Sequence, residues 1–182
     1  KTKVPTFKAT IINEKTGSDK YLSKIKACLN KLCFQNYDTE KELIIKLINK
    51  IIELDGNNYN KNIIDIFIDI SCTNQFYCKF YIKLLQELFI IHTNFQNIFL
   101  EYDIINVYTK SLKNIHYIDS DEDYNQYCKN NKENDYRKGM CICIIELIKQ
   151  RVYDEDNIYS LFLHLINLLK ENEDNIEYVH IN

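Results

Sequence analysis

The fold of this 182-residue chain is decided most clearly by residues 37–55, which read YDTEKELIIKLINKIIELD. The apolar residues of this stretch recur at intervals of three and four, at Ile44, Leu47, Ile48, Ile51 and Ile52. Because an α-helix has 3.6 residues per turn, this spacing lines one face of a helix. We therefore expect an amphipathic helix that ends at Gly56, since glycine tolerates the left-handed conformation common after a helix.

Similar spacing predicts further helices on both sides of this one. They span residues 18–32, 76–92, 95–115, 122–152 and 156–171. Residues 63–72 fit two patterns, because every second residue from Ile64 is isoleucine, as in a half-buried strand, while the apolar residues also fit a helical face. No neighbouring segment offers a partner strand, so we expect a helix over residues 62–73.

The same patterns predict which side chains are inward. For residues 76–92 they are Phe76, Phe80, Leu84 and Leu88. For residues 95–115 they are Ile98, Tyr102, Ile105, Leu112 and Ile115. For residues 156–171 they are Ile158, Leu161, Phe162, Leu165, Leu168 and Leu169. Residues 124–135 are polar all round, which predicts an exposed, mobile extension or loop that packing does not fix.

Composition excludes several classes of protein. Three glycines and one proline are too few for the many tight turns of an all-β fold, and 46% hydrophobic residues exclude wholesale disorder. The helices form consecutive pairs, 18–32 with 37–55, 62–73 with 76–92, and 95–115 with 122–152. We therefore expect an all-α protein, an α-solenoid of about three helix pairs plus one further helix. The repeat domain spans residues 18–171, between tails at 1–17 and 172–182.

Charge is divided unevenly along the chain. Residues 1–50 hold 11 lysines against 5 acidic residues, whereas the remainder holds 12 basic and 21 acidic residues. A basic end can contact phosphates. No segment has the roughly 18 uncharged apolar residues of a membrane helix, and no secretion signal begins the sequence. Lysine, asparagine and isoleucine are abundant and have A/T-rich codons, which points to an A/T-rich genome, such as that of a large DNA virus or a protist.

The chemistry-bearing residues predict neither an enzyme nor a metal or cofactor site. The seven cysteines include no CxxC pair, and we expect them to be small buried hydrophobes in a reducing compartment. The acidic run at residues 119–123 lacks the glycine and terminal glutamate of a calcium loop. Phosphate-binding, zinc-protease and nucleophile-elbow motifs are absent from the sequence. Only two arginines disfavour sequence-specific reading of DNA.

Several short segments, in order, resemble one family. The segment 29–32, LNKL, followed by the aromatic Tyr37, is similar to the "LNKLTPxxF" junction in the middle domain of eukaryotic translation initiation factor 4G. The segment 63–66, IIDI, resembles that family's "VIDL". Tyr77 and Tyr81 stand where the family has the F and Y of "EPxFxxxY".

The later segments continue the resemblance. Residues 137–148 are similar to "RRxxGNIxFIGELF", and residues 154–155 with the helix that follows resemble "TEAIMHDCVVKLL". The matched order covers residues 18–171. Cys33-Phe34 and Asn74-Gln75 replace Thr-Pro and Glu-Pro, and Met140 replaces the asparagine of "GNI".

The resemblance implies a HEAT-like solenoid that acts as a cytoplasmic translation-initiation scaffold, in the host cytoplasm if the source is a virus. Such a scaffold docks a DEAD-box RNA helicase of the initiation factor 4A type and contacts RNA. A cap-binding protein is a further implied partner, held through regions outside this segment or at its N-terminus. No cofactor and no membrane contact are implied.

The links between helices line one edge of a solenoid, so we predict that the partner docks there. The predicted partner contacts are Leu29, Lys31, Leu32, Cys33, Phe34, Gln35, Tyr37, Asn74 and Gln75. The weaker prediction of RNA contact falls on Lys20, Lys24 and Lys31. Phe34 lies in a polar loop and is either an exposed anchor or a staple that packs back on its own helix.

An alternative hypothesis has the same size and composition. It is a viral Bcl-2-like helical bundle that binds host signalling proteins. Such a bundle wraps a central helix, whereas a solenoid packs each helix against its sequence neighbours. No predicted helix is apolar all round, as a central helix should be, which favours the solenoid.

Overall fold

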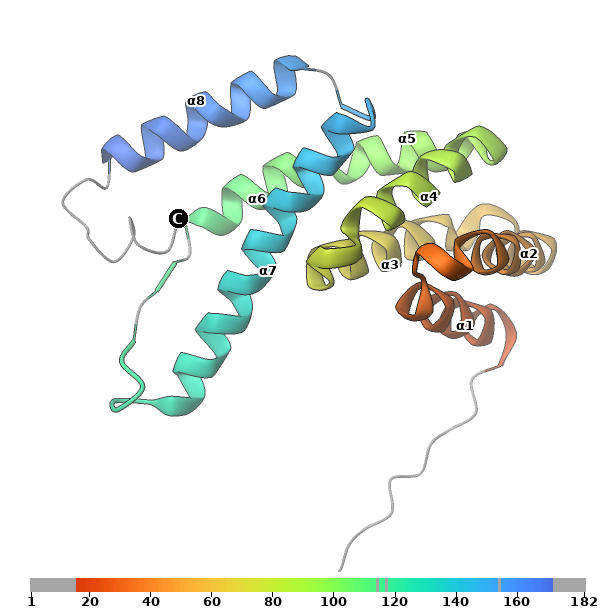
Figure 1. Cartoon of the computed structure of the whole chain (residues 1–182), viewed down its shortest axis with the longest axis horizontal. Helices are drawn as coiled ribbons and strands as arrows, with labels where there is room; N and C mark the ends of the chain where they lie inside the picture. Colours follow the sequence, from red (N-terminus) through yellow and green to blue (C-terminus); the bar gives the residue numbers. More distant parts are fainter. Residues whose placement is uncertain (1–15, 114, 117, 154, 172–182) are drawn as a thin grey trace, which may run out of the picture.

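A computed structural model describes residues 16–113, 115–116, 118–153 and 155–171, and all regular secondary structure in them is helical (Figure 1). The α-helices are α1 (Gly17–Lys31), α2 (Tyr37–Asp55), α3 (Asn60–Thr73), α4 (Cys78–Ile91), α5 (Thr93–Tyr102), α6 (Ile104–Leu112), α7 (Tyr124–Lys149) and α8 (Glu155–Glu171). Single 3₁₀ turns, η1 (Phe34–Asn36), η2 (Gly56–Tyr59) and η3 (Gln75–Tyr77), join the first four helices. The predicted all-α class is confirmed, and none of these helices is long and apolar enough to cross a membrane. The predicted tails lie almost wholly outside the described residues.

The amphipathic helix α2 forms where the sequence predicts it. Ile44, Ile48 and Ile51 are fully buried, and Leu47 is 6% exposed. Gly56 follows the helix with φ +59°, a left-handed conformation in which a residue with a Cβ is strained. The ambiguous residues 63–72 belong to α3, so the helical interpretation is confirmed.

Helix α3 lies at the centre of the molecule and packs against α1, α4, α5 and α7. Its apolar residues are buried on more than one side, and Asp65 and Asp69 occupy the strip that reaches solvent. Asp65 pairs with Lys61 at 2.8 Å, and Asp69 pairs with Lys26 of α1 at 3.3 Å. As the sequence analysis noted, α3 is not apolar all round, but its two half-exposed acids do not prevent it from packing against four helices.

A close backbone approach in the core joins α3 to α7. Gly139 of α7 lies directly over the carbonyl group of Cys72 in α3. A Cβ at position 139 would stand 2.6 Å from the carbonyl carbon, which is far inside van der Waals contact. Glycine is therefore required at this position for the two helices to cross at their present separation.

The single helix expected over residues 95–115 is wrong. Asp103 has φ +44°, which ends α5, and its side chain accepts a hydrogen bond from the Asn106 N–H at 3.2 Å, which caps α6. This left-handed residue resets the helical register, so only Leu112 of the predicted inward residues is buried, and the others are half-buried at the edge of the core. The buried residues of α5 and α6 are Phe95, Phe99, Ile104, Tyr108 and Leu112.

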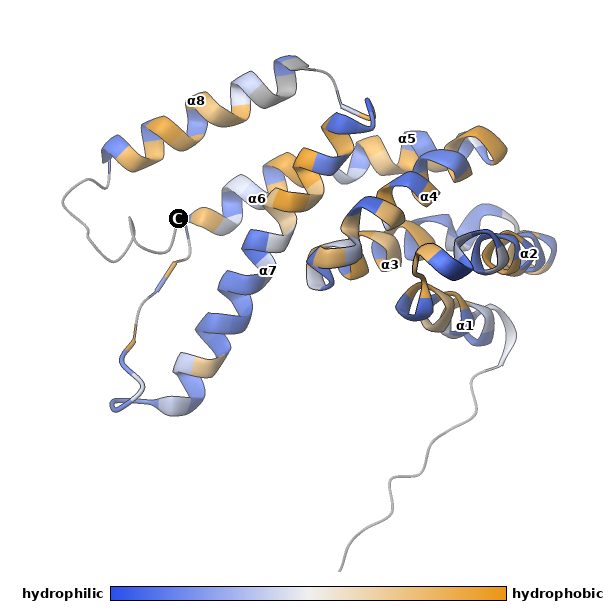
Figure 2. Ribbon diagram, in the orientation of Figure 1, coloured by the Kyte–Doolittle hydropathy of each residue, from blue (hydrophilic) through white to orange (hydrophobic). Residues whose placement is uncertain are grey.

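The polar first half of α7 is a regular helix rather than a loop, and Figure 2 shows its hydrophilic character. It is held by hydrogen bonds in place of apolar packing. The Asn130 side chain is 8% exposed, donates to the His116 carbonyl at 2.9 Å, and accepts from the Gln126 amide at 2.7 Å. Most of residues 124–135 are exposed, as predicted, and their mobility stays a prediction, but the sequence analysis missed the buried Asn130 amide that ties the segment to residue 116.

Several predicted inward residues are exposed. Phe76 is 84% exposed because it belongs to η3, ahead of the first turn of α4. On α8, Leu161 and Leu168 are buried, but Phe162 is 60% exposed and Leu169 is 39% exposed. The apolar residues of α8 therefore extend around more of the helix than the side that packs against the core.

All seven cysteines lie in described residues and are free thiols. Cys28, Cys72, Cys78 and Cys143 are buried, whereas Cys33, Cys128 and Cys141 are half-buried. Burial, with a hydrogen bond to Glu40, raises the pKa of Cys28 to about 11. The neighbouring thiols of Cys72 and Cys78, together with burial, raise the pKa of Cys143. The buried thiols therefore act as small apolar side chains.

We expect thiol reagents to divide the cysteines into two groups. At pH 8 the half-buried Cys33, Cys128 and Cys141 should react first, because burial blocks access of the reagent to the other four thiols. For Cys28 and Cys143 the raised pKa also lowers the fraction of reactive thiolate. Ellman's reagent followed by mass spectrometry would identify the modified sites, and denaturant should release the remaining four. Early modification of Cys72 or Cys143 would contradict this packing.

Candidate protein-docking site

The link between α1 and α2 is a rigid turn that presents Phe34 to solvent. Leu29 and Leu32 are buried and anchor the end of α1. The Asn36 side chain accepts a hydrogen bond from the Cys33 N–H at 2.8 Å and donates one to the Lys31 carbonyl at 2.9 Å. Phe34 is 78% exposed, which is the arrangement that docking requires and not the staple.

The link between α3 and α4 has a similar construction. Asn74 donates to the Tyr81 hydroxyl at 3.0 Å, and Gln75 donates to the Asp135 carbonyl of α7 at 3.1 Å. These bonds hold a second 3₁₀ turn, and Phe76 projects from it with its ring edge-on to Tyr77 at 4.9 Å. The prediction named Asn74 and Gln75 but missed Phe76, the most exposed large apolar residue described.

Ring contacts join the two links. The Tyr37 ring, at the start of α2, lies 6.3 Å from Phe80 of α4, and Phe80 lies 6.2 Å from Tyr77. We call the surface formed by Phe34, Tyr37, Phe76, Tyr77 and Phe80 the link ridge. Of the predicted residues, Tyr37 is thus connected through Phe80 to Tyr77 at the second link; that the two links form one docking surface stays a prediction.

A polar network beneath the ridge fixes α2 against α4. Tyr37 is 8% exposed, and its hydroxyl donates to Glu87 at 3.3 Å. Burial, with the charge of Glu87, raises the pKa of Tyr37, so the hydroxyl remains a donor. Glu87 also pairs with Lys41 at 3.0 Å, and Lys83 lies 4.6 Å above the Tyr37 ring. Tyr37 thus supports the ridge from below, while Phe34 and Phe76 form its exposed part.

Two lysines lie near the links. Lys31 is exposed beside the first link, and the Lys79 ammonium lies 5.6 Å from the Phe80 ring. Exposed aromatic rings with lysines nearby fit a partner that offers apolar pockets with acidic groups at their edges. On α1 the predicted RNA contacts Lys20, Lys24 and Lys31 are all exposed, and their spacing of four and seven places them on one face.

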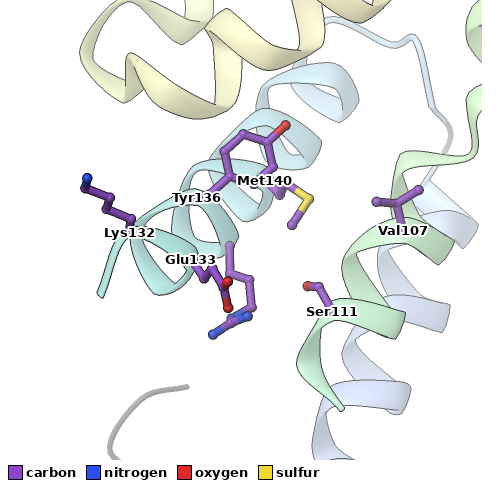
Figure 3. Close-up of a pocket in the computed structure, with 7 residues that line it drawn as sticks. Val107, Ser111, Lys132, Glu133, Tyr136 and Met140 are labelled. Carbon is purple, nitrogen blue, oxygen red and sulfur yellow. The ribbon is translucent and has the colours of Figure 1, made fainter. Parts of the chain in front are cut away.

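A separate cavity of about 430 Å³ lies between α6 and α7, away from the predicted residues. Figure 3 shows Val107 and Ser111 of α6 on one side and Tyr136 and Met140 of α7 on the other. Lys132, Glu133 and Arg137 complete its lining. None of the residues predicted for docking or RNA contact lines this cavity. The described residues also contain no group of three or more side chains placed to hold a metal ion.

Gly139 lies where α3 and α7 cross, and this close crossing explains why a glycine stands at that position of the segment 137–148. Phe76 was missed because it fits the apolar row of residues 76–92 at a spacing of four, although it directly follows the polar residues Thr73-Asn74-Gln75. Comparisons with family models, with curated proteins and with solved structures found no match to this chain.

Proposed function

We propose that this chain is a translation-initiation scaffold that docks a DEAD-box RNA helicase of the initiation factor 4A type through the link ridge. The observation that carries the proposal is the pair of exposed phenylalanines, Phe34 and Phe76, on two links joined by ring contacts. The scaffold acts in the cytoplasm, in the host cytoplasm if the source is a virus, and carries out no reaction of its own.

The architecture proposed for this scaffold is a HEAT-like α-solenoid of about three helix pairs plus one further helix. The contacts that support this proposal fall into two layers of helices. In the first layer α1 contacts α3, and α3 contacts α5. In the second layer Tyr37 of α2 contacts Phe80 of α4, and α4 contacts α7. The third pair combines α5 and α6 with α7, and α8 is the further helix. The direct contact of α3 with α7 connects the two layers.

The ridge suits a partner lobe because its anchors are preorganised. Phe34 and Phe76 stand on 3₁₀ turns held by side-chain hydrogen bonds, so little conformational entropy is lost when they enter a pocket. The nearby lysines favour an acidic rim and accelerate encounter with it. The lysine face of α1 begins at the same link, so RNA bound there would lie next to the docked helicase. A cap-binding protein would bind outside this surface.

The test is binding of an initiation factor 4A-type helicase to the chain with Phe34→Ala, Phe76→Ala and both changes. We expect each single change to weaken binding by at least about tenfold, because a buried aromatic anchor contributes on the order of 2 kcal/mol. The melting temperature should stay unchanged, since both rings are already in water.

The matched control is Ile90→Ala, a change at a 79% exposed residue near the opposite end of α4. It should leave binding within about twofold of the original value. Equal binding by the double phenylalanine variant and the original chain would refute the proposal. If Phe34→Ala lowers the melting temperature but retains helicase binding, Phe34 acts as a staple that packs on its own helix and not as an anchor for the partner.

The Bcl-2-like alternative keeps one observation in its favour, the central position of α3 among four helices. Solution X-ray scattering separates the two architectures. An elongated, curved particle supports the solenoid, whereas a nearly spherical particle supports a bundle that binds signalling proteins.

A further inference from the structure

Helix α8 carries an exposed apolar row on the side away from its buried residues. The exposed large residues of the helix are Tyr159, Phe162, Leu163, Ile166 and Leu169, with exposures from 39% to 67%. Leu161 and Leu168, on the opposite side, belong to the core. Figures 1 and 2 show α8 at the margin of the molecule with hydrophobic residues along much of its length.

The area of this row is large enough for a weak dimer. Two aromatic and three aliphatic side chains with this exposure leave on the order of 500 Å² of apolar surface, as much as the largest patch on a typical monomer. Two such faces together would remove about 1,000 Å² from water, which is at the lower limit for a specific interface. The row therefore provides enough surface for reversible pairing with an identical face.

Opposite charges stand at the two ends of the row. Asp156, Tyr159, Leu163, Ile166 and Lys170 follow one another at intervals of three and four, so they lie along one line of the helix. Asp156 and Lys170 are both exposed and are 14 residues apart, close to four turns or about 21 Å. The row thus begins with an acid and ends with a base.

This order of charges is complementary only to an antiparallel copy of itself. A second α8 in the antiparallel direction brings Lys170 of each copy to the Asp156 end of the other, and the symmetry generates two identical ion pairs. A parallel copy would place like charges together. The antiparallel direction also opposes the two helix dipoles favourably.

We propose that the chain forms a symmetric homodimer through antiparallel pairing of α8, with the apolar row as the seam and Asp156–Lys170 pairs at both ends. We expect a dissociation constant on the order of 1–100 micromolar, because interfaces at this lower limit of area are usually weak and reversible. The link ridge lies on the first four helices, so the dimer leaves it open, and loss of dimerisation and loss of helicase binding are separate results.

The first experiment is sedimentation velocity over a concentration series from about 1 to 500 micromolar. The original chain should shift from monomer to dimer. Phe162→Asp combined with Ile166→Asp should weaken pairing by more than about 100-fold, because it buries charges in the seam. Circular dichroism should show unchanged helix content, since both side chains are largely exposed. A chain that stays monomeric throughout, or a dimer insensitive to these changes, overturns the proposal.

Charge reversal tests the direction of pairing with variants that leave the core intact. Asp156→Lys alone and Lys170→Glu alone should each weaken the dimer by roughly tenfold, because each creates two repulsive contacts. The double variant Asp156→Lys with Lys170→Glu should restore the original affinity. Failure of the double variant to recover, or no response to either single change, overturns antiparallel pairing.

Discussion

Gly139→Ala should destabilise the protein by about 3 kcal/mol, whereas the same change at an ordinary helix position stabilises by about 1 kcal/mol. The new methyl group would meet the Cys72 carbonyl, a backbone group that cannot rotate away. Relief therefore requires α7 to move off α3, which opens the centre of the core. Chemical denaturation followed by circular dichroism measures the change in the free energy of unfolding.

Two variants sharpen this test. Lys138→Ala, at the exposed neighbouring position of α7, should change stability by less than about 0.5 kcal/mol. Cys72→Ala should not rescue Gly139→Ala, because the obstruction is the backbone and not the thiol. If Gly139→Ala proves as stable as the original chain, the crossing of α3 and α7 is not as described.

Leu47→Asp should destabilise the protein by about 4 kcal/mol or prevent folding. Leu47 is 6% exposed on the inner face of α2, so the variant places an unpaired carboxylate among apolar side chains. Thermal unfolding provides the measurement. The control is Leu43→Asp, one turn away on the same helix and 43% exposed, which should cost less than about 1 kcal/mol. Equal melting temperatures for the two variants would mean that the inner face of α2 is assigned wrongly.

Local periodicity predicted the helices that pack against immediate neighbours. The apolar row from Ile44 to Ile52 predicted α2 correctly because the apolar and polar faces of this helix are cleanly separated. The same reasoning failed at Asp103, because one residue in the left-handed region changes the direction of a helix without a glycine or proline to signal it. It did not detect what ties down the first half of α7, because a buried asparagine there replaces the apolar contacts that periodicity detects.

The candidate site was predicted in part for a related reason. Phe34 lies in the short break between two helical patterns, directly before the polar Gln35 and Asn36, so its exposure could be anticipated, and this link is a turn as expected. Phe76 fitted the apolar row of α4 at a spacing of four and was assigned to the core. A 3₁₀ turn has three residues per turn, so the ring rotates out of that row, and spacing alone does not reveal where a 3₁₀ turn gives way to an α-helix.

The position of α3 has a consequence for the order in which the chain acquires its structure during synthesis. Helices that pack only against their sequence neighbours can fold soon after they leave the ribosome. The surface of α3 around Cys72, however, is covered only after Gly139 and the second half of α7 have been synthesised, more than sixty residues later. Until then the nascent chain exposes apolar surface at its centre, so the last contacts to form are those that complete the core.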